Sequence, residues 1–370
     1  YKNWAYLDVT GRNDWSSTLP SGDNSYFYPS VTGSFVFSEI IKAPWLKFGK
    51  LRAGWSQTGN DAPVFSIRDV YENTAFSGSS FNGDPYFLNS LSKKNQFLKP
   101  ESKDAWEVGL EMQMFNNRLG FDVTYYHEKT YDFIMPVAVD PSTGVTTKYM
   151  NAGEAVNKGI ELMLNIVPVR TTDFEWGINV NFAKNDNEVT KLYGDLEQVT
   201  IGSAPFKATV NAMLGERYGQ IRGTDFIYDS EGNKVVGASG LYLSSGVKNL
   251  GSILPDWNMG IRNNFSYKNL SVSALLDIQQ GGKYFSVTNM FGMYSGMLEE
   301  TAANNVRETG TISQGVTGTV TSNGDGTYTV TNTAQNTKNV SAASYYGHYY
   351  SGPTAQNVFD ADYVKLREVT

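Results

Sequence analysis

The sequence predicts an all-β fold, because its composition and its residue periodicity both favour strands. The 370 residues include 23 Tyr, 20 Phe and 7 Trp, so that 14% are aromatic, whereas only 18% are charged, against roughly 25% in soluble domains. Apolar and polar residues alternate with a period of two along many segments, and helical spacing is scarce. We therefore expect an antiparallel β protein whose strands have one apolar and one polar face.

The clearest strand is predicted at residues 104–114. Trp106, Val108 and Leu110 fall on one face of this segment, and acidic or amide side chains fall on the other. A short turn then leads into a second alternating segment at residues 119–127, which predicts a hairpin. The polar face of this hairpin is expected to carry Glu107, Glu111, Gln113 and Asp122.

Two further hairpins repeat the pattern at residues 158–184 and 257–280. Their expected polar faces include Glu161, Asn179, Asn181, Arg262 and Asp277. Asn263 interrupts the apolar face of the last hairpin, and the sequence offers no reason for it. Weaker alternation predicts four additional strands, at residues 3–10, 28–37, 50–57 and 363–370. Together with the three hairpins, this gives about ten strands.

The connections between these segments are alternately long and short along the chain. Transmembrane β-barrels have this arrangement, with short periplasmic turns, long extracellular loops and strands that are apolar outward and polar inward. The longest apolar run, residues 133–139, contains Pro136 and is far shorter than a membrane helix requires. Both ends of the chain stop within an alternating segment. We therefore expect part of the wall of a transmembrane barrel, which this chain alone would not close.

Six segments resemble the SusC/RagA type of TonB-dependent outer-membrane transporter of Bacteroidetes. They are WLKFGKLRAGWSQTGN at 45–60, LKPESKDAWEVGLE at 98–111, NAGEAVNKGIE at 151–161, LPDW at 254–257, QQGG at 279–282 and DADYVKLREV at 360–369. The resemblance implies a barrel of about 22 strands, of which residues 1–370 would form part of one domain, with the plug domain and the final strands outside this sequence.

The same resemblance implies a function and a set of partners. A SusD-like surface lipoprotein would capture oligosaccharide or peptide cargo, and the barrel would import it across the outer membrane with energy supplied through TonB. The sequence leaves glycan and peptide cargo both open. A siderophore or cobalamin receptor is the alternative within the barrel class, and a soluble β-rich glycan-binding surface protein is the alternative outside it.

Enzymatic and nucleic-acid-binding functions are disfavoured by the residues themselves. The net charge of −7 has the wrong sign for a nucleic-acid groove. The chain has no Cys and only two His, His127 and His348, which are expected in different loops, and it lacks the common hydrolase and phosphate-binding motifs. Oxygen-rich segments at 229–233 and 323–326 are interpreted as turns rather than calcium loops. We expect no enzyme activity, no cofactor and no metal.

The long loops are where function is expected to lie, because the wall would be scaffold. Aromatic faces can stack on sugar rings or fill pockets of a protein partner, although packing within a loop or an aromatic belt is an equally good reading. The loop residues predicted to contact cargo or the lipoprotein are Trp15, Tyr71, Phe81, Tyr86, Tyr346, His348 and Tyr349.

Overall fold

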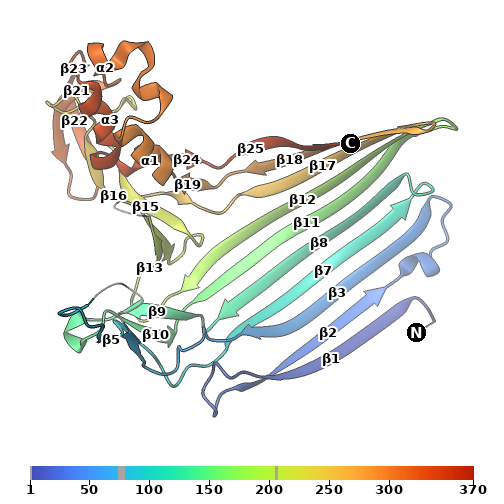
Figure 1. Cartoon of the computed structure of the whole chain (residues 1–370). Coiled ribbons are helices and arrows are strands. Elements are labelled where there is room, and N and C mark those ends of the chain that lie inside the picture. The colour runs from blue at the N-terminus through green and yellow to red at the C-terminus, as the bar shows by residue number, and fades with distance from the viewer. Residues whose placement is uncertain (1, 74–79, 205–206) are drawn as a thin grey trace.

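A computed structural model describes residues 2–73, 80–204 and 207–370. Ten strands form one antiparallel sheet in which neighbours in the chain are neighbours in the sheet (Figure 1). These strands are β1 (Ala5–Trp15), β2 (Ser25–Phe35), β3 (Leu46–Asn60), β7 (Glu101–Met114), β8 (Leu119–Tyr131), β11 (Glu154–Arg170), β12 (Phe174–Lys191), β17 (Trp257–Tyr267), β18 (Leu270–Gln280) and β25 (Tyr363–Val369). Each coincides with one predicted segment, so the ten-stranded prediction is confirmed.

The strand register gives the sheet two chemically different faces. Leu110 lies opposite Val123, which lies opposite Leu162, and Leu162 lies opposite Phe182. The same row continues across the next three strands with Met259, Ile278 and Val364. We call this side the apolar face and the opposite side, which carries the carboxylates and amides, the polar face. Because side chains alternate along a strand, one register error would exchange the two faces.

A tight turn joins β7 to β8 and fixes their register. Phe115, Asn116 and Asn117 all have positive φ, at 52°, 53° and 63°. Asn tolerates this left-handed region better than most residues, whereas Phe rarely adopts it. The turn therefore concentrates the backbone strain that lets Met114 pair directly with Leu119.

Short and long connections lie at opposite ends of the sheet (Figure 1). The predicted alternation of long and short connections is wrong for the first loop, residues 16–24, which is no longer than the link at 36–45 at the other end. The strands extend further than predicted, because the β1–β2 ladder continues to Trp15 opposite Ser25. Trp15 is thus the last residue of a strand, on the same side as Leu7 and Val9, and not a loop residue.

The long loops contain secondary structure of their own, which the sequence did not predict. Four strands form a sheet in the order β13 (Gln198–Ser203), β14 (Thr209–Met213), β15 (Gln220–Phe226) and β16 (Ser244–Ser252), and three form another in the order β6 (Ser92–Lys93), β10 (Thr147–Asn151) and β9 (Ile134–Ala138). The two-stranded ladders are β4 (Tyr71–Asn73) with β5 (Phe87–Asn89), β19 (Lys283–Phe285) with β24 (Val358–Asp360), β20 (Thr311–Ile312) with β23 (Asn339–Val340), and β21 (Val316–Ser322) with β22 (Tyr328–Gln335).

Helices in the described residues are short. The α-helices are α1 (Val287–Tyr294), α2 (Val306–Thr309) and α3 (Ala342–Ser351), and the 3-10 helices are η1 (Phe37–Glu39), η3 (Pro141–Thr143), η4 (Glu299–Thr301), η5 (Ala303–Asn305) and η6 (Thr354–Asn357). Within the described part of the chain, none has the length and apolar character needed to cross a membrane. Ser286 and Ser341 cap α1 and α3 by accepting hydrogen bonds from backbone N–H groups in the first turn.

The buried apolar clusters lie at the loop end rather than behind the sheet. One contains Val189, Leu192, Val199 and Ala212, another Leu19, Ala62 and Leu98, and a third Ile227, Val235 and Val316. The middle of the sheet is a single layer whose apolar row has no protein packed against it among these clusters. A sheet normally buries its apolar face against another layer, so this face requires a different apolar environment.

Two polar residues on the apolar face have aromatic partners. His127 belongs to β8, not to a loop as predicted, and its ring stacks on Trp106 with centroids 5.6 Å apart and planes 13° apart. Asn263, which the sequence left unexplained, accepts a hydrogen bond from the indole N–H of Trp176 over 3.2 Å. Phe265 stacks on the same indole at 5.8 Å. Both residues therefore belong to aromatic groups of the kind found in interfacial belts.

Candidate functional site

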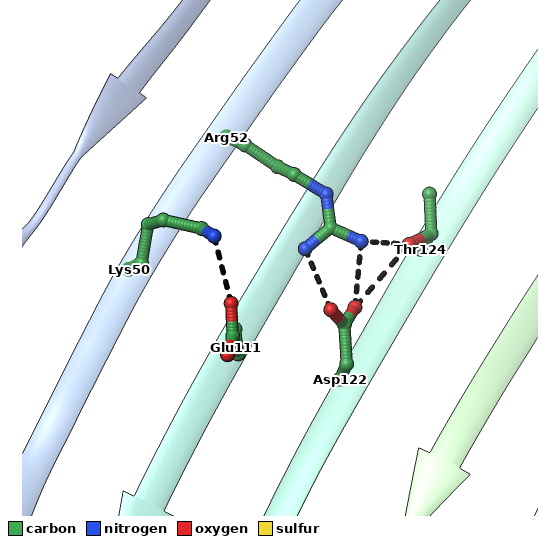
Figure 2. Close-up of polar contacts among 5 residues, drawn as sticks. All are labelled: Lys50, Arg52, Glu111, Asp122 and Thr124. Carbon is green, nitrogen blue, oxygen red and sulfur yellow. Dashed lines mark hydrogen bonds and ion pairs between the residues drawn. The ribbon is translucent and has the colours of Figure 1, made fainter. Parts of the chain in front are cut away.

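Ion pairs connect the polar side chains of β3, β7 and β8. Glu111 and Asp122 lie directly opposite each other, and like charges in that position repel. Lys50 offsets Glu111 at 2.7 Å, and Arg52 offsets Asp122 through two hydrogen bonds of 2.6 and 2.8 Å (Figure 2). Arg52 also donates to Thr124 Oγ1 at 2.5 Å. The two carboxylates are therefore individually neutralised.

Gly109 makes the reach of Arg52 possible. The Arg52 side chain starts on β3 and crosses β7 to contact β8, passing directly over Gly109, its register partner. A Cβ atom at position 109 would stand 2.6 Å from the guanidinium carbon of Arg52. Gly109 is thus required because the Arg52 side chain lies close against its backbone, and not because of an unusual φ angle.

A ladder of amides continues the polar face across β11, β12 and β17. Asn179 donates to Asn165 at 2.6 Å, and Asn264 donates to Asn179 at 2.8 Å. Asn181 lies two residues further along β12 and borders a shallow hollow with Glu161 and Asp277. Amide side chains both donate and accept, so they link three strands without adding charge.

The polar face ends in a second set of ion pairs on β17, β18 and β25. Asp277 accepts hydrogen bonds from Arg367 at 2.7 Å and from the Tyr363 hydroxyl at 3.2 Å. Arg262 pairs with Glu368 at 2.8 Å. Near the loop end, Glu107 and Glu161 line a hollow of about 450 Å³ around Tyr126. The predicted polar-face residues thus share one face, and ion pairs hold Glu111, Asp122, Arg262 and Asp277 there. Gln113, opposite Gly120, lies on the same face.

Three of the predicted loop aromatics lie on α3 instead of in an irregular loop. Tyr346 donates through its hydroxyl to the Glu300 carbonyl at 2.5 Å, and its ring stacks on Tyr349 at 6.3 Å. Burial raises the pKa of Tyr349 to about 12. His348 Nε2 lies 2.8 Å from the Tyr242 carbonyl, and burial lowers the pKa of this imidazole. These contacts favour packing within the loop over direct exposure at a mouth.

The other predicted loop residues are exposed. Tyr71, Phe81 and Trp15 are 74%, 72% and 71% exposed, and Tyr86 is 38% exposed. Tyr71 pairs with Asn89 in the β4–β5 ladder, and Phe81 closes a small bridge with Asp84. The structure therefore separates the predicted aromatics into a packed group on α3 and an exposed group elsewhere.

Two features of the loop end were missed by sequence reasoning. Lys207 donates to the Gly352 carbonyl, and burial lowers the pKa of its amine to about 8. A cavity of about 520 Å³ lies where β9 and β13 meet the ends of β11 and β12, and Phe133, Met135 and Leu192 are among its apolar walls. Neither has a local sequence signal, because each depends on segments that are distant in the chain.

Comparison with known proteins decides the family. Residues 2–242 match the model of the TonB dependent receptor-like β-barrel. The chain belongs to this family. It is 30% identical over 78% of its length to TonB-dependent receptor P26 of Formosa agariphila, covering 31% of that protein. It is 26% identical over 60% of its length to TonB-dependent receptor SusC of Bacteroides thetaiotaomicron, covering 24% of that protein.

Solved structures show the same fold. The structure of the RagAB peptide transporter superposes with a TM-score of 0.66 at 22% identity, over 78% of this chain and 33% of the other. The chain thus spans about a third of the length of the first curated relatives it matches. The predicted SusC/RagA-type resemblance and the transmembrane β-barrel fold are confirmed.

Family membership locates this TonB-dependent receptor barrel in the outer membrane. The row of apolar side chains from Leu110 to Val364 matches the lipid-facing band that such a barrel needs. The alternative of a soluble glycan-binding protein is therefore wrong. Among residues 2–73, 80–204 and 207–370, no three His, Asp or Glu side chains gather as a metal-binding group.

Proposed function

We propose that this chain forms part of the wall and extracellular mouth of a TonB-dependent importer of nutrient oligosaccharides or peptides. The observation that carries the proposal is the separation of the two ends of the sheet: apart from the 3-10 helix η1 between β2 and β3, every described connection that folds into extra sheets, helices and a cavity lies at one end (Figure 1). A passive wall has no need of such structure, whereas a receptor must select cargo before import.

In this proposal, the polar face lines the interior of the barrel. Its residues would form a hydrated, mostly neutralised surface along which polar cargo moves without being bound tightly. The ion pairs of Lys50 and Arg52 keep the cations from trapping anionic cargo. The residues assigned to this surface are Glu107, Glu111, Gln113, Asp122, Glu161, Asn179, Asn181, Arg262 and Asp277.

The loop end would receive cargo together with a SusD-like surface lipoprotein. The exposed aromatics Trp15, Tyr71, Phe81 and Tyr86 are suited to contact a partner or cargo, because their side chains are accessible and aromatic residues are enriched where proteins bind partners. Tyr346, His348 and Tyr349 would support that surface from within α3. Energy would come through TonB acting on a plug domain, and the reaction is transport, without enzyme chemistry or a cofactor.

The loop at 281–362 offers a direct test, because the short β19–β24 ladder and the hydrogen bond from Ser286 N to the Asn357 carbonyl close its base. In the full-length gene, residues 287–356 would be replaced by a short Gly-Ser linker. Uptake of fluorescein-labelled maltoheptaose and casein peptides by cells would be compared with barrel assembly. We expect assembled barrels and lost uptake, and in wild-type cells a proton uncoupler should also stop uptake.

A matched control shortens only the tip of the exposed β21–β22 hairpin, residues 323–327, where Asp325 holds the turn through Thr327. This variant should retain uptake. Undiminished uptake in the large deletion would refute the function assigned to the loop. Loss of the assembled barrel would refute the separation of wall from loop.

A further inference from the structure

The cavity at the loop end lies between the edges of two small sheets. β13 is the last strand of the four-stranded sheet and β9 the last strand of the three-stranded one, and among the described residues each pairs with a strand on one side only. Val199, Thr200 and Ile201 are consecutive, yet all three line the cavity. Because successive side chains of a strand point to opposite faces, the cavity borders the edge of β13 itself.

The two edges differ in what they offer to a further strand. On β9, Pro136 has no backbone N–H, and the N–H of Ile134 donates to the Glu101 carboxylate at 2.8 Å. Such features block pairing along an edge. On β13, Thr200 pairs with Asn211 and Gly202 with Val210, so Ile201 is a bulge residue without a partner on β14. Unlike β9, β13 contains no Pro, and among the described residues only its β14 side is paired, so its edge is the one that can accept another strand.

The cavity is lined mainly by apolar side chains, and several of the polar groups that border it already have partners. Asn187 donates to Asn157 at 2.8 Å and accepts from the N–H of Tyr218 at 2.8 Å. Glu154 pairs with Lys129 at 2.8 Å and with Lys191 at 3.6 Å. An oligosaccharide would bury many hydroxyl groups here without new partners, which is costly. An apolar side chain would only displace water.

We propose that this cavity is a subsite for peptide cargo. An extended peptide segment adds to the edge of β13, and its apolar side chain enters the space bounded by Met135 and Leu192. Main-chain hydrogen bonds supply affinity in this mode of recognition, and the side-chain cavity supplies specificity. The volume of about 520 Å³ lies in the range of small-ligand sites. The inference rests on the proposed import function and selects peptide over glycan at this subsite.

The test uses the full-length transporter purified in detergent and three probes. These are fluorescein-labelled Gly-Gly-Val-Leu-Val-Gly-Gly, the matched peptide Gly-Gly-Ser-Thr-Ser-Gly-Gly, and maltoheptaose. Ile201→Pro removes the backbone N–H of a cavity residue that has no register partner on β14, and Met135→Trp fills the cavity. Val247→Trp is the control, since Val247 lies exposed on β16 of the same sheet.

For the apolar peptide, we expect Kd to rise at least about tenfold in both cavity variants, equivalent to about 1.4 kcal/mol, and to stay unchanged in the control. The polar peptide should bind weakly throughout. Equal apolar-peptide affinity in wild type and both variants would overturn the proposal.

A crosslinking experiment on the wild-type protein tests the subsite without relying on variants that fold correctly. A benzoylphenylalanine in place of the central Leu of the peptide should crosslink wild-type protein near Met135 and Ile201. Crosslinks confined to other segments would contradict the subsite. Binding of maltoheptaose without binding of the apolar peptide would also overturn it, while leaving the import function standing.

Discussion

Arg52 on β3 and Asp122 on β8 are joined by two hydrogen bonds across an intervening strand (Figure 2). This pair holds three strands of the polar face in register, and it keeps Asp122 from repelling Glu111. Both side chains are about three-quarters buried or more. The two guanidinium donors of Arg52 satisfy both carboxylate oxygens of Asp122. The pair therefore both stabilises the wall and neutralises the charge of Asp122.

Removing Arg52 should therefore destabilise the barrel. For Arg52→Gln we expect a loss of about 1–3 kcal/mol in the free energy of unfolding, because Asp122 is left without its cation. Arg52→Lys should recover only part of it, since an ammonium cannot match the bidentate geometry. Adding Asp122→Asn to Arg52→Gln should restore most of the loss. Urea titration of full-length protein in lipid vesicles measures these differences, and additive effects of the two substitutions would contradict the pairing.

The apolar face should be intolerant of charge. Arg at Leu110, Val123, Leu162, Val180 or Leu276 should cost roughly 2–4 kcal/mol near the bilayer midplane, because the guanidinium enters hydrocarbon. Gln113→Arg is the matched control on the polar face of β7 and should be mild. The same vesicle-based unfolding measurement applies. Equal sensitivity on both faces would mean that the sheet is packed against protein on both sides.

The Trp176–Asn263 hydrogen bond predicts a nonadditive pair on the apolar face. Trp176→Phe should destabilise the protein by about 1–2 kcal/mol beyond the effect of the ring change, because it leaves the Asn263 amide without its donor. Asn263→Leu in that background should recover stability. A double-mutant cycle measures the coupling. Zero coupling would show that the amide is satisfied by water or lipid headgroups instead.

The buried position of His348 predicts that the stability of its loop, and not that of the wall, depends on pH. Its folded pKa lies below 6.5 because burial disfavours the charged ring. The unfolded loop then binds more protons than the folded one below pH 6.5, so loop stability should fall as pH decreases through that value. Hydrogen exchange in α3 should show this slope in wild type and lose it in His348→Gln. His127→Gln is the control and should leave the slope unchanged.

The wall could be predicted from the sequence and the loop end could not, for physical reasons. Each strand carries its own period-two signal, and the turn lengths order the strands. His127 and Trp15 were misplaced because alternation does not mark where a strand ends. The contacts of Lys207 with Gly352 and of Thr224 with Thr354 join segments far apart in the chain. The bulge at Ile201 depends on its pairing with β14, so no local pattern reveals it.

The most direct test of the account is the orientation of the sheet in the outer membrane. This sequence has no Cys, so single cysteines placed in this region report single sites. Asp325→Cys marks the exposed β21–β22 turn at the loop end, and Asn116→Cys marks the short β7–β8 turn at the other end. A membrane-impermeant maleimide should label position 325 in intact cells and position 116 only after the outer membrane is permeabilised. Labelling of position 116 in intact cells with protection of position 325 would contradict the account.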